Sequence, residues 1–173
     1  MGSKRALVHL VPTPTRADPA ELARAGLLGF RAAGLSAVVR GLTAIKSHFG
    51  ERGGAGFVPP AAIRAIVDEV RAAGGNPFLT DTTTLYTGMR TNAVDYARLA
   101  HDHGFTIDAV GAPFIVADGL VGANETEIEI PGVHDRRVAI ATDAIRAGSA
   151  IVVSHVTGHL VTGLGATVKT LGM

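Results

Sequence analysis

The stretch PPAAIRAIVDEVRAAGGNPFLTD, residues 59–81, decides the fold. Behind the helix-opening pair Pro59-Pro60, apolar residues recur at the spacing of one helix face: Ile63, Ile66, Val67 and Val70. Gly74-Gly75 ends this helix, and residues 77–81 then form a short strand with a polar end. A helix that turns tightly into a buried strand is typical of a βαβ unit, in which the strands run parallel.

The rest of the chain repeats this alternation. We predict strands over residues 6–11, 35–47, 77–81, 150–153 and either 106–110 or 113–117, and helices over residues 18–34, 59–74, 92–103 and 138–147. Residues 122–134 alternate between apolar and acidic side chains, which is typical of an antiparallel hairpin. The sequence therefore predicts a single α/β domain over residues 1–173, three-layered, with a mainly parallel sheet, helices on both faces and a small antiparallel hairpin.

Composition restricts the function. The chain has 173 residues, of which 47% are hydrophobic and 18% charged, so it folds rather than remaining disordered. The net charge is +1 and no dense basic tract with interleaved aromatic residues is present, so we expect no nucleic-acid partner. No apolar run approaches the roughly 20 residues of a membrane helix, so we expect no membrane partner and a cytoplasmic protein. The chain lacks cysteine, which excludes disulfides and an Fe–S cluster ligated by this chain.

Polar side chains follow the predicted strands at the points where these end. The carboxyl ends of parallel strands meet at one edge of a sheet, and ligands of α/β proteins bind there. We therefore predict a ligand-binding site at this edge, which gathers the strand-end residues Lys46, His48, Thr82, Asp118 and Ser154.

Residues 154–169 are the densest candidate site. The glycines in this segment allow backbone N–H groups to approach an anion: Gly158, Gly163 and Gly165. Lys169 adds a full positive charge, and His155 and His159 share one face if the segment is helical. The segment suits a phosphate, a carboxylate or a nucleotide, although it matches neither the Walker A loop nor the G-x-G-x-x-G order. The alternative is a flexible glycine turn with two surface histidines.

The segment from Asp81 to Arg90 is the second candidate. A strand-end carboxylate, three threonine hydroxyls and an arginine can orient a substrate or hold a hydrated magnesium ion, whereas the alternative is a turn that caps the next helix. Near Lys46 and His48, Glu51 adds an acid, although such mixtures on loops are usually solvated. We interpret His101-Asp102-His103, at a helix C-terminus, as structural.

A divalent metal is the alternative ligand. Zinc, nickel and iron accept histidine and aspartate as ligands. Asp81, His48, His155 and His159 are the candidates to converge on a metal ion, and His155 and His159 form the candidate chelating pair. The sequence contains neither the H-E-x-x-H order of a zinc helix nor the G-x-S-x-G elbow of a serine hydrolase. It therefore favours a phosphate-containing or other small anionic ligand over a metal.

Four ordered blocks resemble the family called domain of unknown function 362: residues 44–51, 77–90, 112–120 and 154–173. The resemblance covers residues 36–173. Family members are often labelled Fe–S centre or ferredoxin-containing proteins and continue into more of the domain. The resemblance thus implies the N-terminal part of a longer domain, one piece of a split protein or a shortened version of the domain. The last block departs from the family pattern, because Gly165-Ala166-Thr167 replaces a Gly-Gly pair before the alanine and Thr170 replaces an asparagine.

A fainter similarity is to the nickel-pincer lactate racemase family. There, too, a strand ending in His is followed by a glycine-rich segment and a lysine. This similarity implies a nucleotide-like cofactor held near Lys169, with His155 as proton shuttle or metal ligand.

Three hypotheses for function follow. In the first, the domain binds a small anionic ligand or cofactor as part of an enzyme, with His155, Lys169 and Asp81 as catalytic residues and Arg90 as an anion contact. In the second, it is a non-catalytic binding or scaffold subunit of a redox or metal-dependent system. In the third, its glycine-rich loops form a purely structural interface. We also expect a homo-oligomer or a partner subunit, because an uncovered sheet edge pairs with another chain.

Overall fold

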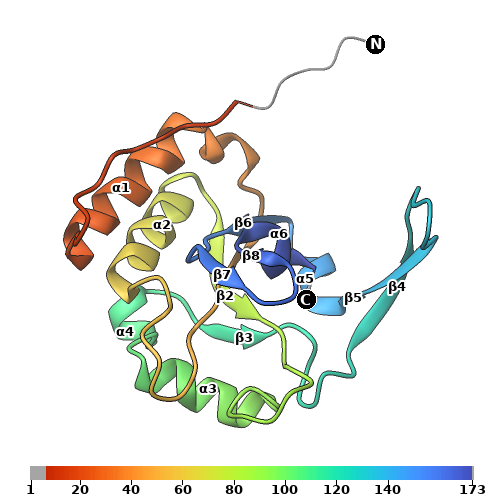
Figure 1. The fold of residues 1–173 in the computed structure, drawn as a ribbon. Helices are drawn as coiled ribbons and strands as arrows, with labels where there is room; N and C mark the ends of the chain where they lie inside the picture. Colours follow the sequence, from red (N-terminus) through yellow and green to blue (C-terminus); the bar gives the residue numbers. More distant parts are fainter. Residues whose placement is uncertain (1–6, 173) are drawn as a thin grey trace.

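A parallel sheet forms the centre of the computed structural model, which describes residues 7–172 (Figure 1). Its strands, in spatial order, are β3 (Phe114–Val116), β2 (Asn76–Asp81), β1 (Leu42–Lys46) and β6 (Ser149–Val152). Each neighbouring pair is parallel. The prediction of an α/β fold around a mainly parallel sheet is confirmed, and of the two alternatives for the third strand, residues 113–117 are the correct one.

Helices lie on both faces of this sheet. They are α1 (Pro19–Ala32), α2 (Pro60–Ala72), α3 (Ala93–Asp102), α4 (Ile107–Val110), α5 (Thr142–Arg146) and α6 (Thr167–Leu171), with a 3-10 turn over Leu35–Val38. Figure 1 shows α2 against one face with α1 on its outer side, while the short α5 lies on the opposite side of the sheet. The three-layer arrangement is therefore as expected, with much heavier cover on the α2 face. None of the helices between residues 7 and 172 is long and apolar enough to cross a membrane.

The apolar stripe of α2 attaches this helix to the sheet. Ile63, Val67 and Val70 are completely buried and share one core with Ile45 of β1 and Leu79 of β2. The polar face of α2 points away from the sheet, and there Glu69 pairs with Arg31 of α1 at 2.7 Å. The spacing of the apolar residues in the sequence thus fixes which face of α2 meets the strands.

The glycine pair after α2 lets the chain reverse without loosening the core. Gly74 has a φ of 84°, in the left-handed region that favours glycine. Gly75 lies against the core, where a Cβ atom would sit 2.5 Å from Val39 Cγ1 and 2.8 Å from Val70 Cγ1. The first glycine makes the turn and the second gives the backbone room to enter β2.

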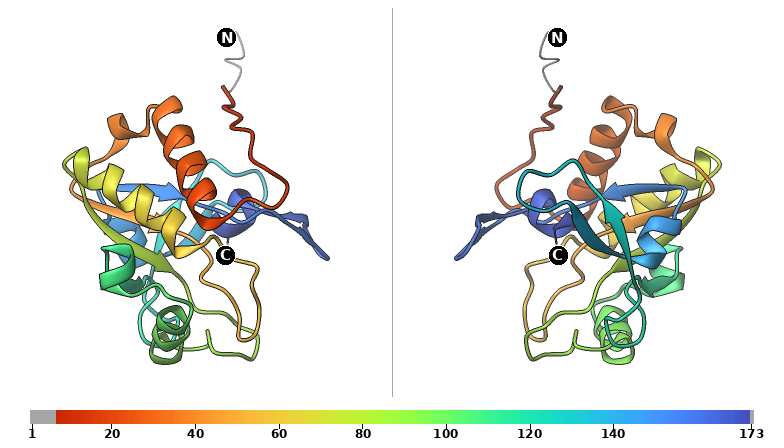
Figure 2. Two further views of the ribbon diagram at one scale, coloured as in Figure 1. Left: turned by 90° about the vertical axis from the view of Figure 1, so that its left-hand side faces the viewer. Right: turned by 90° about the vertical axis from the view of Figure 1, so that its right-hand side faces the viewer.

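Two antiparallel hairpins extend from the parallel sheet. One pairs β4 (Glu125–Glu129) with β5 (Arg137–Ala141) and projects sideways in Figure 1. The other pairs β7 (Thr157–His159) with β8 (Gly163–Gly165), and its projection is clearest in Figure 2. The first hairpin confirms the small antiparallel element expected near residues 122–134.

Three sequence predictions of secondary structure are wrong in whole or in part. The strand expected over residues 35–47 is shorter, because residues 35–38 form a 3-10 turn and β1 covers only Leu42–Lys46. The helix expected over residues 138–147 is instead β5 followed by the short α5, because residues 137–141 alternate in polarity and pair with β4. The strand expected over residues 6–11 does not form: Ala6 lies outside the described residues, and residues 7–11 pair with no strand. Leu7 and Leu10 there are 80% and 88% exposed, so this apolar run has no core to join.

The strand order creates a crevice at one end of the sheet. From β1 the chain proceeds to β2 and β3 on one side, whereas β6 lies on the other side of β1. Connections leaving neighbouring strands in opposite directions open a space outside their carboxyl ends, and ligands of open α/β sheets bind there. In this chain the space lies beyond Lys46 and Val152, which are paired in register.

We predict that Ile63→Ala lowers the free energy of unfolding by about 2–5 kcal/mol, because it removes a completely buried side chain and leaves a cavity under α2. The matched control is Ile107→Ala on α4, where the side chain is 63% exposed and the loss should stay below about 1 kcal/mol. Urea denaturation followed by circular dichroism measures both. Equal losses in the two variants would contradict the assignment of the core.

Candidate functional site

A cavity of about 440 Å³ lies at the crevice between the ends of β1 and β6. The loops after β1 and β2 form one wall, and the segment after β6 forms the other. The lining residues are His48, Glu51, Gly56, Asp81, Thr82, Thr83, Thr84, Tyr86, Arg90, His155, Thr157, His159, Gly165, Lys169 and Thr170. Of the strand-end residues that the sequence indicated, His48, Asp81 and Thr82 thus line the cavity together with the C-terminal segment.

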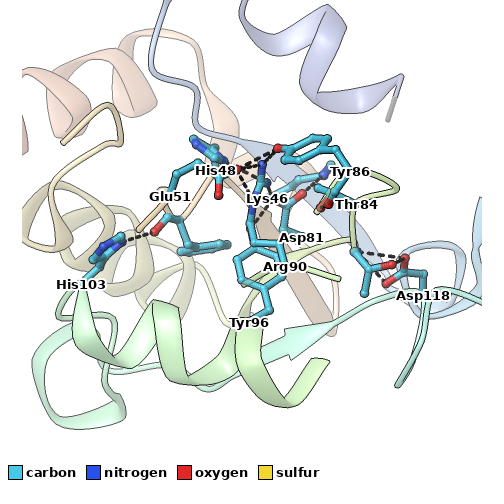
Figure 3. Close-up of polar contacts among 12 residues, drawn as sticks. Lys46, His48, Glu51, Asp81, Thr84, Tyr86, Arg90, Tyr96, His103 and Asp118 are labelled. Atoms are coloured by element: carbon cyan, nitrogen blue, oxygen red, sulfur yellow. Dashed lines mark hydrogen bonds and ion pairs between the residues drawn. The ribbon is translucent and has the colours of Figure 1, made fainter. Parts of the chain in front are cut away.

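Asp81, the last residue of β2, is the buried centre of the first wall (Figure 3). One of its carboxylate oxygens accepts a hydrogen bond from Lys46 Nζ at 2.5 Å, and the other accepts one from the Tyr96 hydroxyl at 2.5 Å. Arg90 Nη1 lies 3.7 Å from the second oxygen. A buried carboxylate is stable only when it is paired and hydrogen-bonded, and here three segments supply the partners.

Arg90 joins the loop after β2 to the loop after β1. Arg90 is buried, with 6% of its surface exposed. Its guanidinium donates to Glu51 through Nε at 2.8 Å and through Nη2. Nη2 also contacts the Tyr86 hydroxyl, which donates to the same Glu51 oxygen at 2.8 Å. Arg90 Nη1 lies 3.2 Å from His48 Nδ1. The five donors of the guanidinium are therefore largely committed to protein groups.

His48 is held as a neutral imidazole. Burial lowers its pKa below the ordinary value, and the positive charge of Arg90 lowers the pKa further. Because an arginine only donates, Nδ1 of His48 must accept from Arg90, which places the proton of the neutral ring on Nε2. The arrangement thus selects one tautomer of His48.

Tyr96 remains protonated at the opposite end of the network. Burial and the negative charge of Asp81 both raise the pKa of Tyr96 well above its ordinary value. A protonated hydroxyl is the form that donates to Asp81. Tyr96 is fully buried among Phe49 and Phe114, which hold its ring edge-on.

A second carboxylate fixes the loop after β2. Asp118 accepts hydrogen bonds from the Thr83 backbone N–H at 2.9 Å and from the Thr83 hydroxyl at 2.6 Å (Figure 3). Asp118 does not line the cavity, so its contact with Thr83 acts through loop position. Lys46 and Ser154, also expected to touch a ligand, stand outside the lining too: Lys46 pairs with Asp81, and Ser154 accepts a hydrogen bond from Thr167 at 3.2 Å.

The second wall contains the C-terminal glycines and histidines in an unexpected form. His155 lies just before the β7–β8 hairpin and His159 ends β7, so neither is helical and the two rings are not brought together by helical spacing. All three glycines belong to this hairpin, but of these only Gly165 lines the cavity. The three glycines therefore do not line the cavity together, as the anion-binding prediction required.

A metal-chelating pair gains no support from this geometry. His159 Nδ1 accepts hydrogen bonds from the backbone N–H groups of Val161 and Thr162 at 3.2 and 3.1 Å, which places the proton of the neutral ring on Nε2. Within residues 7–172 no group of three or more His, Asp or Glu side chains is arranged to hold a metal ion.

Sequence reasoning missed several members of the site. Tyr86 and Tyr96 were not among its candidates, and Glu51 was interpreted as a solvated loop residue. Glu51 and Arg90 lie on separate loops, and they form an ion pair only because the tertiary fold brings those loops together. The interpretation of His103 as structural agrees with its contacts, because Nδ1 lies 2.7 Å from the Phe49 carbonyl and the ring stacks on Phe57.

The two walls differ in how far their polar groups are paired. Lys46, Arg90, Asp81 and Glu51 form a network of two cations and two carboxylates, and its charges balance. On the C-terminal wall no described group pairs with the Lys169 ammonium or with the His155 ring, and the Thr157 and Thr170 hydroxyls likewise make no side-chain hydrogen bond there. An excess of unpaired donors and positive charge therefore faces a neutral wall.

We predict that Asp81→Asn lowers the free energy of unfolding by about 3 kcal/mol or more, because it leaves the nearly buried Lys46 ammonium without its counter-charge. Asp68→Asn is the matched control, since Asp68 pairs with Arg64 on an exposed helix surface and such pairs contribute less than about 1 kcal/mol. Chemical denaturation of both variants provides the comparison. An Asp81 variant as stable as the control would show that the buried network contributes nothing.

The lowered pKa of His48 predicts a pH dependence of stability. Below the unfolded imidazole pKa of about 6.5, the unfolded chain binds a proton that the folded site excludes, so the free energy of unfolding falls as the pH decreases from there toward the folded pKa. His48→Gln should flatten this acid-side loss, whereas His101→Gln, at an exposed position on α3, should leave it unchanged. Denaturation series between about pH 5 and pH 8 decide this; parallel curves for all three proteins would contradict the assignment.

Comparison with known proteins identifies the family. The sequence profile of the family described as Domain of unknown function (DUF362) matches residues 43–173, which include every strand of the parallel sheet except the first residue of β1. No curated protein matches the chain. No solved structure matches it either. The profile spans most of the chain and both walls of the cavity, and the protein therefore belongs to the DUF362 family.

Proposed function

We propose that this chain binds a small anionic ligand, such as a phosphate or carboxylate compound, in the cavity at the carboxyl ends of β1 and β6. The observation that carries the proposal is the contrast between the two walls. Lys169 brings an uncompensated positive charge to the cavity, whereas the nearby Lys46 and the lining Arg90 are balanced by Asp81 and Glu51. An oxyanion supplies the missing counter-charge and accepts the unpaired donors.

The donors on the C-terminal wall suit such a ligand. Thr157 and Thr170 line the cavity with Lys169, and their hydroxyls make no side-chain hydrogen bond within the described part of the chain. His155 adds a ring nitrogen at the same wall. Hydrogen bonds from these donors to an anion would be stronger than bonds between neutral groups, because the acceptor is charged.

Binding takes precedence over catalysis in this proposal. Asp81, expected from the sequence to act in catalysis, is engaged by Lys46, Tyr96 and Arg90, and Glu51 is engaged by Arg90 and Tyr86. A general base needs an available lone pair. The His155 ring has no partner among residues 7–172, whereas Glu51 offers only Oε2, because its bonds to Arg90 and Tyr86 all use Oε1. We assign any enzymatic role to His155, and loss of turnover in a folded His155→Ala variant would distinguish that role from binding alone.

We predict that Lys169→Ala weakens the binding of inorganic phosphate about tenfold, or about 1.4 kcal/mol, because it removes the uncompensated charge. The matched control is Arg24→Ala, which removes the same charge from the exposed surface of α1, away from the cavity, and should leave the affinity unchanged. Isothermal titration calorimetry with phosphate, and with succinate as a carboxylate probe, measures both. Equal affinities in the two variants would show that Lys169 holds no anion.

The response to pH and salt separates an anion from a metal. Inorganic phosphate held by a lysine should bind more weakly as salt rises and should not be lost in mild acid, because the ammonium and the phosphate both stay charged and only screening changes. A metal held by histidines should instead be lost in acid, since each ring must be neutral to coordinate it. Titrations at fixed salt and then at fixed pH distinguish these responses, and steep acid loss with little effect of salt would overturn the proposal.

A further inference from the structure

The β4–β5 hairpin is a separate arm of the domain. Figure 1 shows it extending beyond α5, and its two strands pair from Glu125 with Ala141 to Glu129 with Arg137. One face of the arm is polar and is formed by Glu125, Glu127, Glu129 and Arg137. The other face is mainly apolar and is formed by Thr126, Ile128, Val138 and Ile140. An isolated two-stranded hairpin is marginally stable in water, so this arm gains stability from any strand added to it.

The backbone of β5 offers such an edge. Ile130 N–H donates to the Arg136 carbonyl and Thr142 N–H donates to the Asn124 carbonyl, which identifies the even-numbered pairs as the hydrogen-bonded ones. In an antiparallel ladder the alternate residues direct their N–H and C=O groups away from the partner strand. Arg137 and Ala139 are therefore the outward-facing residues, and no described group outside the ladder bonds to their backbone.

Charge distinguishes this edge from the opposite one. If β4 paired antiparallel with a second β4, every register that keeps the apolar faces together would place glutamates opposite glutamates: Glu125, Glu127 and Glu129. Like charges directly opposite destabilise a strand pair, and charged residues protect natural sheet edges. The β5 edge has no such protection, because Ala139 and Ala141 lie on the same face as Arg137.

We propose that β5 is a dimerisation strand, which pairs antiparallel with β5 of a second copy of this chain about a two-fold axis at Ala139. In this register the two Ala139 residues face each other and exchange their outward hydrogen bonds. Val138 of one copy lies opposite Ile140 of the other on the apolar face, and Arg137 lies opposite Ala141. The two arms form a four-stranded antiparallel sheet whose outer edges are the acidic β4 strands. The proposal does not depend on the function assigned to the cavity.

The absence of cysteine from the sequence allows a direct test. Ala139→Cys places two thiols opposite each other across the proposed axis, within the Cα separation that a disulfide spans. We expect this variant to form a disulfide-linked dimer on mild oxidation at micromolar concentration, seen on non-reducing electrophoresis. Glu127→Cys is the matched control on the outward edge of β4 and should cross-link several-fold less.

A second pair of variants tests the association without cross-linking. Ala139→Pro removes an N–H that lies outside the β4–β5 ladder, so the hairpin keeps its own bonds while the outward donor is lost. Light scattering should show a dimer for the unmodified chain and for Glu127→Pro, and a monomer for Ala139→Pro with an unchanged circular dichroism spectrum. A monomeric unmodified chain, a dimer that Ala139→Cys fails to cross-link, or equal cross-linking of both cysteine variants would overturn the proposal.

Discussion

The negative charge of Asp81 is the constraint on which the organisation of the site depends. Ionised carboxylates are costly to bury, and this one ends a strand at the centre of the sheet. Its compensation comes from Lys46 on β1, Tyr96 on α3 and Arg90 on the loop between β2 and α3. Because these residues come from separate elements, satisfying one charge also fixes the positions of a neighbouring strand, a helix and a loop.

The same compensation leaves few groups of the first wall available to a ligand. Arg90 is positioned against Asp81 and then recruits Glu51 and Tyr86, which brings the loop after β1 against the loop after β2. Once formed, the network has few donors left for a ligand. The proposed recognition of an anion therefore rests on the segment after β6, where Lys169 and the hydroxyls of Thr157 and Thr170 line the cavity without partners between residues 7 and 172.

Much of this fold follows from sequence patterns whose physical cause is local. The apolar stripe of α2 and the Asp18 cap of α1, which accepts from the Glu21 N–H at 2.8 Å, act within a few residues of the chain. The strand ends could be placed at one edge for the same reason, since parallel pairing alone brings them together. Residues 137–141 were mistaken for helix because a short apolar segment fits either periodicity until its partner strand is known. The Glu51–Arg90 pair is likewise a product of tertiary structure, since nothing in the sequence indicates that two loops 39 residues apart will meet.

The difference between the walls also bears on how the family can diversify. Substitutions in the network around Asp81 remove partners of a buried charge and therefore cost stability. The C-terminal hairpin and α6 contribute little to the buried core, which in this segment includes no large apolar side chain among the described residues. Substitutions at Thr157, Lys169 or Thr170 would therefore cost little stability. Under the proposed function, such changes in a short terminal segment would alter the ligand that the cavity holds while the buried scaffold stays the same.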